Sequence, residues 1–459
     1  MYALLPARER RLIWVLALVQ FTIIMDFMVM MPLGPQIMSA FRIAPAAFAA
    51  AVSAYSWCSG LSGLFAATYI DRFDRRRLLL TVYALFALSN LACAMATSYP
   101  LLLVSRAFAG ITGGVLGAGV MAIVADVVPV ARRGAATGVI MTSFSLAAIA
   151  GVPAGVLLGA HHGWAAPFWL LAALSASIGC IAAAIVPSLA EHLQVRPPAV
   201  SEALPALWRM LSRTRHIKAF TLTFLMMLAH MLVIPFISPM LVANHGVPPG
   251  QISWLYMAGG AATFFTSRAV GRLADRIGHR LVFRIFGVLA MVPMLVMTHL
   301  PAVPFAIMVP FFALFMVIGS GRMIPMQAIL TTVPEPTERG AFLSANGAVQ
   351  ALGTGCGAWI GGLLLSTDTA GHVLGYGTNG WLSVSIAALA LVWIGRVTSA
   401  PTAREPASAG RASGPAVLEA GAAVATLEHL DGGHGEGCNN EDASRPILSG
   451  GDFAKGYQN

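Results

Sequence analysis

Apolar runs of about 20 residues recur along most of this 459-residue chain, and twelve of them precede residue 400. A helix of about 20 residues is long enough to cross a hydrocarbon layer of roughly 30 Å. With 57% hydrophobic and only 10% charged residues, the chain has too little polar surface for a water-soluble domain. The sequence therefore predicts an all-α membrane protein with twelve transmembrane helices. The predicted spans are 12–34, 46–70, 78–97, 99–124, 135–160, 166–187, 218–241, 251–274, 281–299, 303–326, 341–366 and 380–398.

Basic residues are distributed unevenly between the two sides of these spans. The loops on one side contain many arginines, whereas the opposite loops contain Arg42 alone. By the positive-inside rule, the arginine-rich side and both termini are cytoplasmic in a multi-pass protein of the inner membrane. The net charge of +9 follows from this topology, so no nucleic-acid partner is expected. The basic residues of this side are Arg8, Arg10, Arg11, Arg72, Arg75, Arg76, Arg77, Arg132, Arg133, Arg196, Arg209, Arg213, Arg215, Lys218, Arg276, Arg280, Arg339 and Arg396.

A basic hairpin between the second and third runs, residues 68–77, recurs between the eighth and ninth, residues 271–280. Asp71 of the first hairpin corresponds to Asp275 of the second at an offset of 204 residues, and a later Arg-Gly pair recurs at an offset of 206. Repeats of six helices in the same orientation are typical of transporters built from two rocking bundles. We therefore predict two six-helix bundles related by a pseudo-two-fold axis along the membrane normal.

The parts of the chain outside the bundles differ in composition. In the linker, leucines and Trp208 fall at helical spacing beside arginines, which predicts a short amphipathic helix on the cytoplasmic face. The tail is rich in Ala, Gly and Ser and is predicted to be disordered. Its acidic residues and histidines between 428 and 438 are separated by glycines that hold no metal geometry, so neither a metal nor a cofactor is expected. The predicted segments are an N-terminus 1–11, bundles 12–187 and 218–398, a linker 188–217 and a tail 399–459.

Several motifs carry a resemblance to a known family. The hairpin Gly-Arg-Leu-Ala-Asp-Arg-Ile-Gly-His-Arg, residues 271–280, resembles the loop signature of the major facilitator superfamily. The first hairpin departs from it, with Ala67 and Asp74 where the family has glycines. Arg-Ala-Phe-Ala-Gly at 106–110 resembles the family's helix 4 signature. Gly-Val-Pro-Ala-Gly-Val-Leu-Leu-Gly at 151–159 is similar to its helix 5 antiporter signature. The residues of that antiporter motif are Gly151, Pro153, Gly155 and Gly159, and Pro153 removes one backbone donor and should bend helix 5.

The resemblance covers about residues 12–398 and is greatest to the twelve-helix drug and sugar efflux branch. It implies alternating access around a cavity lined by helices 1, 4, 7 and 10, with proton antiport as the energy source. It also implies a role for the hairpins as a conformational latch. Simple positive-inside topology is the alternative, but it accounts for the arginines and not for the repeated aspartates.

The latch is also expected on physical grounds. Asp71 can accept hydrogen bonds from the amides at the start of helix 11, near Gly340, where the helix dipole favours negative charge. The arginines that follow can pair with Asp126 at the end of helix 4. Such contacts would hold one access state and break in the other. The predicted latch residues are Asp71, Arg75, Arg76, Asp126, Gly271, Asp275, Arg276, Gly278 and Arg280.

Ionisable side chains at membrane depth are rare in this chain and are functional candidates because they are costly there. Asp26 in helix 1 and Arg106 in helix 4 lie at matching depths and are predicted to face each other, with Asp26 as the proton carrier. A static ion pair is the alternative. The 204 offset maps Asp26 onto His230, a second candidate for titration or a neutral packed histidine. Because an offset of 206 maps Arg106 onto Phe312, the proton chemistry is expected in the first half.

Polar residues inside other spans are candidates for a substrate cavity. Arg322 lies near the inner end of helix 10, where snorkelling to the cytoplasmic interface is favoured over contact with an anionic substrate. Methionines near Asp26 and His230 favour an amphipathic or aromatic substrate. The predicted cavity residues are Gln20, Tyr55, Gln327, Asn346, Gln350 and Arg322.

The sequence thus predicts a secondary transporter that exports a small amphipathic molecule, such as a drug-like compound, a sugar or a metabolite, in exchange for protons. A symporter importing a metabolite on the same fold is the first alternative, and a transport-dead sensor that uses its tail is the second. The chain contains no GxxxxGK[ST], HExxH or GxSxG motif, so an enzyme is not predicted. The expected partners are the substrate, protons and the lipid bilayer, and the chain is expected to be a monomer.

Overall fold

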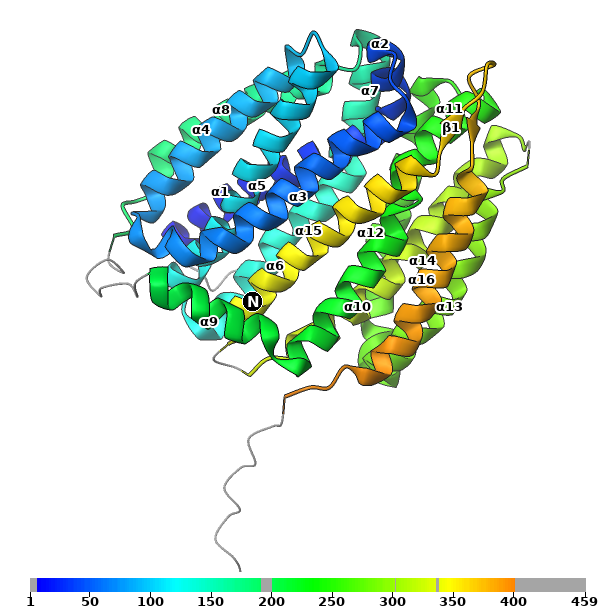
Figure 1. Ribbon diagram of the computed structural model, residues 1–459. Helices are drawn as coiled ribbons and strands as arrows, with labels where there is room; N and C mark the ends of the chain where they lie inside the picture. Colours follow the sequence, from blue (N-terminus) through cyan, green and yellow to red (C-terminus); the bar gives the residue numbers. More distant parts are fainter. Residues whose placement is uncertain (1–5, 191–199, 302, 336–337, 401–459) are drawn as a thin grey trace, which may run out of the picture. The chain divides into compact units, whose positions relative to one another are not determined.

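The computed structural model describes residues 6–190, 200–301, 303–335 and 338–400, which lie within one compact unit (Figure 1). Each of the twelve predicted spans corresponds to a helical rod in these residues. The first half contains α1 (Ala7–Met30), α2 (Gly34–Phe41), α3 (Pro45–Tyr69), η2 (Ile70–Arg72), α4 (Arg75–Ala94), α5 (Tyr99–Val127), α6 (Val130–Leu146), η3 (Ala147–Gly151), α7 (Val152–His162) and α8 (Ala166–Ile185).

The linker contains one helix, α9 (Val200–Ser212), as its leucine spacing predicts. Leu207 packs toward the second half, but Trp208 is 70% exposed, so the apolar face is narrower than expected. The second half contains α10 (Thr214–Met231), η5 (Ile234–Phe236), α11 (Ile237–His245), α12 (Pro249–Ile277), α13 (His279–Thr298), α14 (Phe305–Thr332), α15 (Arg339–Leu363), β1 (Ser366–Thr367), β2 (Val373–Leu374), α16 (Tyr376–Trp393) and η6 (Ile394–Arg396). Apart from Ser399 and Ala400, the predicted tail lies outside the described residues.

Three of the rods are interrupted. The first bends after α1, and α2 then meets α3 at 117°. The fifth contains the π-helical turn η3 immediately before Pro153, because a proline in a helix removes a backbone donor and displaces the preceding turn. The seventh is broken near Pro235, which lies at the start of η5. The sequence predicted only the irregularity at Pro153.

By length and hydropathy, nine helices of the described residues can cross a membrane, or ten if α2 and α3 together form one span. Neither α12 nor α15 is among them. The last turns of α12 carry Arg268, Arg272 and Asp275, and α15 carries Asn346 and Gln350. Because α15 packs between α3 and α10, its polar residues meet protein rather than lipid.

The two ends of the fold can be told apart by their loops. The basic end holds the start of α1, helix α9 and the two basic hairpins, whereas α2, α7, α11 and β1 gather at the opposite end (Figure 1). Helices α3 and α15, one from each half, lie side by side and form a long seam (Figure 1). A Cβ added at Gly60 of α3 would lie 2.9 Å from the carbonyl oxygen of Ala348 in α15, so glycine allows this close approach.

The apolar core is divided in a way that distinguishes the two ends. The largest cluster joins residues of both halves toward the opposite end, including Val29 and Phe48 from the first and Phe236 and Phe312 from the second. Toward the basic end, one cluster consists of first-half residues alone, and another consists of second-half and linker residues with only Leu64 of α3 packed against it. The halves are therefore joined at the opposite end and have separate cores at the basic end.

Candidate functional site

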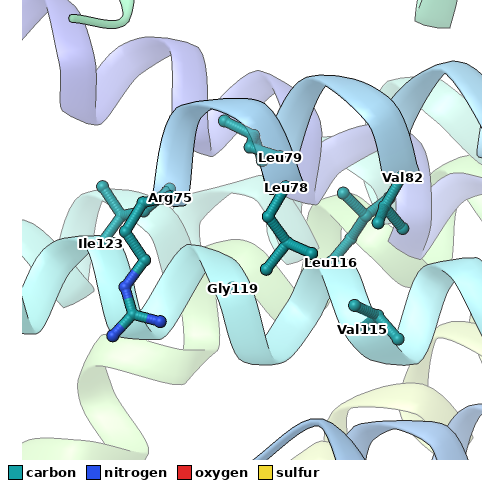
Figure 2. Close-up of a pocket in the computed structure, with 8 residues that line it drawn as sticks. All are labelled: Arg75, Leu78, Leu79, Val82, Val115, Leu116, Gly119 and Ile123. Atoms are coloured by element: carbon teal, nitrogen blue, oxygen red, sulfur yellow. The ribbon is translucent and has the colours of Figure 1, made fainter. Parts of the chain in front are cut away.

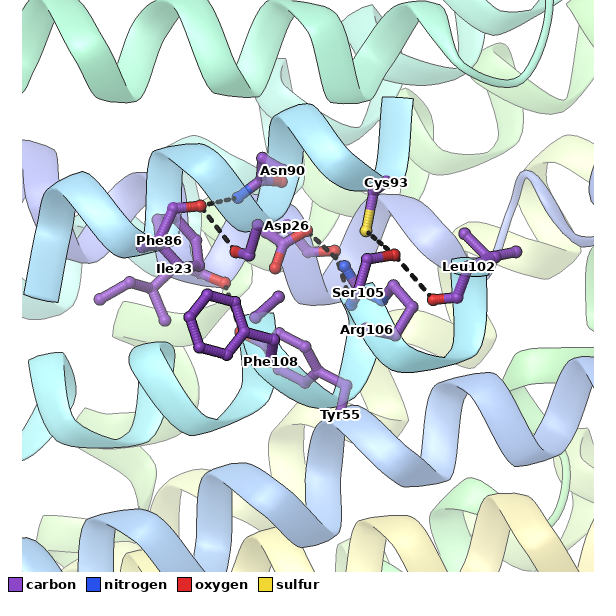
Figure 3. Close-up of polar contacts among 12 residues, drawn as sticks. Ile23, Asp26, Tyr55, Phe86, Asn90, Cys93, Leu102, Ser105, Arg106 and Phe108 are labelled. Carbon is purple, nitrogen blue, oxygen red and sulfur yellow. Dashed lines mark hydrogen bonds and ion pairs between the residues drawn. The ribbon is translucent and has the colours of Figure 1, made fainter. Parts of the chain in front are cut away.

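The carboxylate of Asp26 in α1 and the guanidinium of Arg106 in α5 form an ion pair inside the first bundle (Figure 3). Arg106 Nη1 lies 2.5 Å from Asp26 Oδ1, and the side chains are 1% and 0% exposed. Arg106 Nη2 also lies 3.5 Å from the backbone oxygen of Asp26. The two side chains that were predicted to face each other are thus in contact, away from water.

Aromatic rings enclose the arginine. Its Cζ lies 4.4 Å from the ring centroid of Tyr55 in α3 and 5.7 Å from that of Phe168 in α8, distances typical of cation–π contacts. Gly110, one turn after Arg106, brings α3 against α5, because an added Cβ there would collide with the backbone of Tyr55. Tyr55 was predicted to line a substrate cavity, but its ring packs against Arg106 and its hydroxyl lies 3.4 Å from the carbonyl oxygen of Ile23.

The pair is not saturated with hydrogen bonds. Among the described residues, Asp26 Oδ2 and Arg106 Nε are buried and have no partner. Nearby polar groups are engaged elsewhere: Cys93 donates to Ser105, which donates in turn to a backbone oxygen (Figure 3). One carboxylate oxygen therefore remains available to a proton while the other holds the arginine.

Glycines of the antiporter motif pack against the helix that carries Asp26. A Cβ at Gly151 would lie 3.3 Å from Met25, and Cβ atoms at Gly155 and Gly159 would collide with Val29 and Leu33. The same segment touches the second half, since a Cβ at Gly260 of α12 would lie 2.7 Å from the carbonyl oxygen of Ala148 in η3. The motif thus connects the Asp26 helix to the other bundle.

The second half contains a different pair, between His230 of α10 and Arg322 of α14. Arg322 Nη2 lies 2.6 Å from His230 Nδ1. Arg322 is only 2% exposed, so the expectation that its side chain extends to the interface is wrong. A Cβ at Gly319 would lie 3.4 Å from the His230 ring, and a Cβ at Gly321 would collide with the ring of Phe286, so these glycines allow both rings to pack against α14. In each half, therefore, a buried arginine joins the first helix to the fourth.

Arg75 contacts three groups at the first hairpin. Its Nε lies 2.8 Å from Asp126 Oδ2 in α5, its Nη2 lies 2.5 Å from Asp71 Oδ1, and its Nη1 donates to the Ile70 carbonyl at 2.8 Å. Figure 2 shows the arginine at one end of a small apolar cleft of about 10 Å³ between α4 and α5, beside Gly119 and Ile123. The predicted contact between an arginine of the hairpin and Asp126 is present.

The predicted bond from Asp71 to helix 11 is not formed in this structure. Asp71 pairs with Arg75 of its own bundle and is 57% exposed. Gly340 at the start of α15 has open space, with no atom within 4 Å of an added Cβ. This agrees with the separate cores at the basic end: the two sides of the latch are apart.

The structure explains why the first hairpin lacks the second signature glycine. Gly278 of the second hairpin has a φ of 98°, which disfavours any residue with a side chain. The corresponding Asp74 has a φ of −56° and caps α4 by accepting a bond from the Arg76 N–H at 3.0 Å. Slight burial favours a higher pKa for Asp74, but bonds from the Arg76 and Leu189 N–H groups and the Ser188 hydroxyl outweigh it and lower the pKa.

The other hairpin residues show how far the repeat extends. Arg76 donates to the carbonyl of Ala183 near the end of α8, and Arg280 donates to the carbonyl of Val397 after η6, an equivalent position in the second half. Asp275 lies 3.5 Å from His279 and is 73% exposed. No contact within 4 Å is found for a Cβ at Gly271. Arg276 lies in the last turn of α12.

The remaining residues predicted for the cavity differ in burial and in their contacts. Asn346 is buried and accepts a bond of 2.7 Å from Thr223, which fixes α15 to α10. Gln20 and Gln350 are half-buried, and Gln327 is exposed. Among the described residues, no hydrogen bond joins these glutamines to one another or to the buried pairs.

The sequence analysis did not predict two ion pairs that occupy corresponding positions in the two halves of the repeat. Glu9 at the start of α1 lies 3.3 Å from Arg132 at the start of α6. Arg213 before α10 lies 2.7 Å from Glu338 before α15. Offsets of 204 and 206 map the first pair onto the second with the charges exchanged, so applying the same offsets to Glu9 and Arg132 would have revealed it.

The family model of the Major Facilitator Superfamily matches residues 16–223 and again residues 219–430. The chain therefore belongs to this superfamily and is a multi-pass membrane transporter of small molecules, not an enzyme.

Relatives and solved structures agree with this. A probable sugar efflux transporter of Helicobacter acinonychis (strain Sheeba) is 22% identical over 79% of this chain and 88% of its own. A chloramphenicol resistance protein of Streptomyces lividans is 29% identical over 74% and 84%. A bacterial homolog of the human lysosomal transporter Spinster, in an inward-facing and occupied conformation, has the same fold, with a TM-score of 0.70, 14% identity and coverage of 86% and 97%. A D-xylose-proton symporter has a TM-score of 0.67 at 14% identity over 84% and 97%.

Proposed function

We propose that this chain is a proton-coupled efflux transporter of the inner membrane, which exports a small amphipathic molecule by alternating access. The observation that supports it most is the Asp26–Arg106 pair, fully buried between two helices of one bundle. Buried ionisable groups in a membrane are costly and mark coupling sites. The antiporter motif that packs against α1 beside Asp26 supports export over import.

The chemistry needed from the pair is proton binding at a stated atom. Asp26 Oδ2 has no partner among the described residues, so it is the oxygen at which a proton would bind. Protonation removes the charge that neutralises Arg106, which weakens the contact between α1 and α5. The freed guanidinium keeps its aromatic neighbours, Tyr55 and Phe168, and the bundle then favours a different access state.

The division of the cores supports an assignment of the access state. The bundles share a core at the opposite end and have separate cores at the basic end. If the basic end faces the cytoplasm, as the positive-inside rule indicates, this is the inward-open arrangement. In that state the latch residue Asp71 is parted from α15, and its engagement there would accompany closure of the cytoplasmic side.

The substrate class follows from the relatives and the residues together. The curated relatives are named for sugar efflux and for chloramphenicol resistance. The half-buried Met28 and Phe27 lie beside Asp26, and half-buried Tyr256 packs edge-on against Phe312 in the second half. These adaptable apolar groups suit an amphipathic or aromatic compound.

We expect the chain to act as a monomer.

The test uses inside-out membrane vesicles with an acidified lumen and a pH-sensitive dye inside. Adding a compound of a drug and sugar panel should release luminal protons from wild-type vesicles while the compound accumulates. Asp26→Asn should abolish both signals, and Asp368→Asn, an acid in the β1–β2 hairpin, should keep them. Unchanged proton release in Asp26→Asn would remove the coupling role. In vesicles preloaded with the compound, its exit from the lumen together with protons would identify an importer.

A further inference from the structure

Arg106 and Arg322, the buried arginines that join the first and fourth helices of each half, are neutralised differently. Arg106 has Asp26 within ion-pair distance, whereas Arg322 has no carboxylate within 4 Å among the described residues. We propose that Arg322 and His230 form a binding site for an oxyanion, so that the transported molecule carries a carboxylate or a comparable anionic group. This proposal rests on the transport function proposed above and specifies its substrate class.

The hydrogen-bond chemistry of the pair fixes its donors. A guanidinium has five N–H donors and no acceptor, so His230 Nδ1 must accept the 2.6 Å bond from Arg322. The histidine is then neutral and carries its proton on Nε2, which makes that nitrogen a second donor. Arg322 Nε is buried without a partner in the described part of the chain. The site therefore offers several donors and contributes no negative charge.

The buried charge indicates a ligand rather than a stable end state. An arginine stays charged in proteins, so it cannot relieve its burial by losing a proton. A buried charge without a counter-ion is strongly unfavourable, yet Arg322 is only 2% exposed. A planar carboxylate or a phosphate matches the guanidinium fork and would complete the pairing.

The repeat shows which group is missing. An offset of 204 places His230 where the first half has Asp26. The first half thus supplies its own carboxylate to its arginine, and the second half supplies a histidine instead. A substrate carboxylate would take the place that the Asp26 carboxylate occupies in the other half.

The position of the pair in the bundle suits a substrate. α14 packs mainly against α12 and α13, and α10 against α15 and α16, so the Arg322–His230 bond bridges two groups of helices that otherwise meet chiefly between α13 and α16. His230 is only half-buried. An anion that binds both side chains would draw these groups together, which is a coupling of binding to helix movement.

The test uses the purified full chain in a neutral detergent, with unfolding temperature followed by tryptophan fluorescence. The probes are benzoate, benzamide as its uncharged equivalent, inorganic phosphate, and phosphatidylglycerol in nanodiscs. Benzoate or phosphate should raise the unfolding temperature of the wild type, and benzamide should not. In Arg322→Gln the anion should bind about 30-fold more weakly or not detectably, because a charge-assisted hydrogen bond is lost.

Two further variants make the result specific. Arg268→Gln removes one charge at an exposed position of α12 and should keep the full response. Arg322→Lys retains the charge without the fork and should bind the anion at intermediate strength. The proposal is overturned if neither benzoate nor phosphate stabilises the wild type, if Arg322→Gln is stabilised equally, or if only phosphatidylglycerol acts through Arg322, which would identify a lipid headgroup site. Asp26→Asn should retain anion binding while losing proton coupling, so failure of the two proposals can be told apart.

Discussion

Replacing Arg106 with glutamine should destabilise the protein strongly, whereas replacing Arg322 with glutamine should not. Both side chains are at most 2% exposed, so the difference lies in their partners and not in their burial. Arg106→Gln leaves the Asp26 carboxylate without a counter-charge in the bundle interior. Arg322→Gln removes a charge that has no carboxylate partner and leaves a neutral histidine. Removing one partner of a buried ion pair costs about 3–5 kcal/mol. Removing a buried charge that has no partner also removes the cost of burying it, so the change should be close to neutral.

The magnitude for Arg106→Gln has an upper limit, because Asp26 can take up a proton. For a carboxyl group with an ordinary pKa of about 3.9, protonation costs about 1.4 kcal/mol per pH unit above that value. The limit is therefore roughly 4 kcal/mol at about pH 7 and roughly 2 kcal/mol at about pH 5.5. The folded variant then binds one more proton than the unfolded chain, so its stability rises as pH falls. In the wild type the charge of Arg106 favours the ionised carboxylate, so the pH dependence should be weaker than in Arg106→Gln.

The assay is equilibrium unfolding in detergent micelles at these two pH values. Arg106→Gln should lose most stability at the higher pH and recover about half of it at the lower. The double variant Asp26→Asn with Arg106→Gln, an amide pair that can share a hydrogen bond, should be more stable than Arg106→Gln alone near neutral pH. Equal losses for Arg106→Gln and Arg322→Gln, or a loss for Arg106→Gln that does not change with pH, would refute this reasoning.

Three further outcomes are expected. Asp74→Ala should cost about 1 kcal/mol of unfolding free energy, because the α4 cap is lost. The loss should be greatest near neutral pH and decline in acid, since the pKa of Asp74 is lowered in the fold. Asp74→Asn keeps the acceptor and should lose less stability. Glu9→Arg should lower the free energy of unfolding by about 0.5 kcal/mol, and adding Arg132→Glu should restore that stability in a double-mutant cycle. If the effects of the two substitutions on stability simply add, the pair has no stabilising role. Gly60→Val should lower the unfolding temperature and reduce transport, because overpacking against Ala348 costs about 1–3 kcal/mol. Wild-type stability and transport in this variant would argue against the close contact of α3 with α15.

The helical rods were predictable because hydropathy and length are local properties of the sequence. The breaks were less so. Pro153 indicated an irregular fifth rod, but the break near Pro235 depends on how that rod packs at the opposite end. The polar α15 was still identified from its length, and its burial between α3 and α10 explains why its composition differs from that of a lipid-facing helix.

The sites show where sequence reasoning stopped. The pairing of Asp26 with Arg106 was predictable from their matching depths in the membrane, because the direction of each helix determines the depth of each residue. The repeat did not identify Arg322, because an offset of 206 maps Arg106 onto Phe312. Arg322 lies ten residues later, and its long side chain contacts His230. Side-chain direction is a tertiary property that spacing does not contain. The departure at Asp74 was visible, but only its backbone dihedrals reveal that the first hairpin does not need a glycine.

The central claim is that protonation of Asp26 controls the access state. It can be measured without knowing the substrate, with spin labels on cysteines at Gly134 and Gly340 in a chain whose native cysteines are replaced by serine. An added Cβ at either position meets no atom within 4 Å. These positions lie at the basic ends of the two bundles. The inter-label distance distribution of the otherwise wild-type chain should change between about pH 8 and about pH 5, and that of Asp26→Asn should be the same at both. A pH-dependent shift that persists in Asp26→Asn would contradict the account.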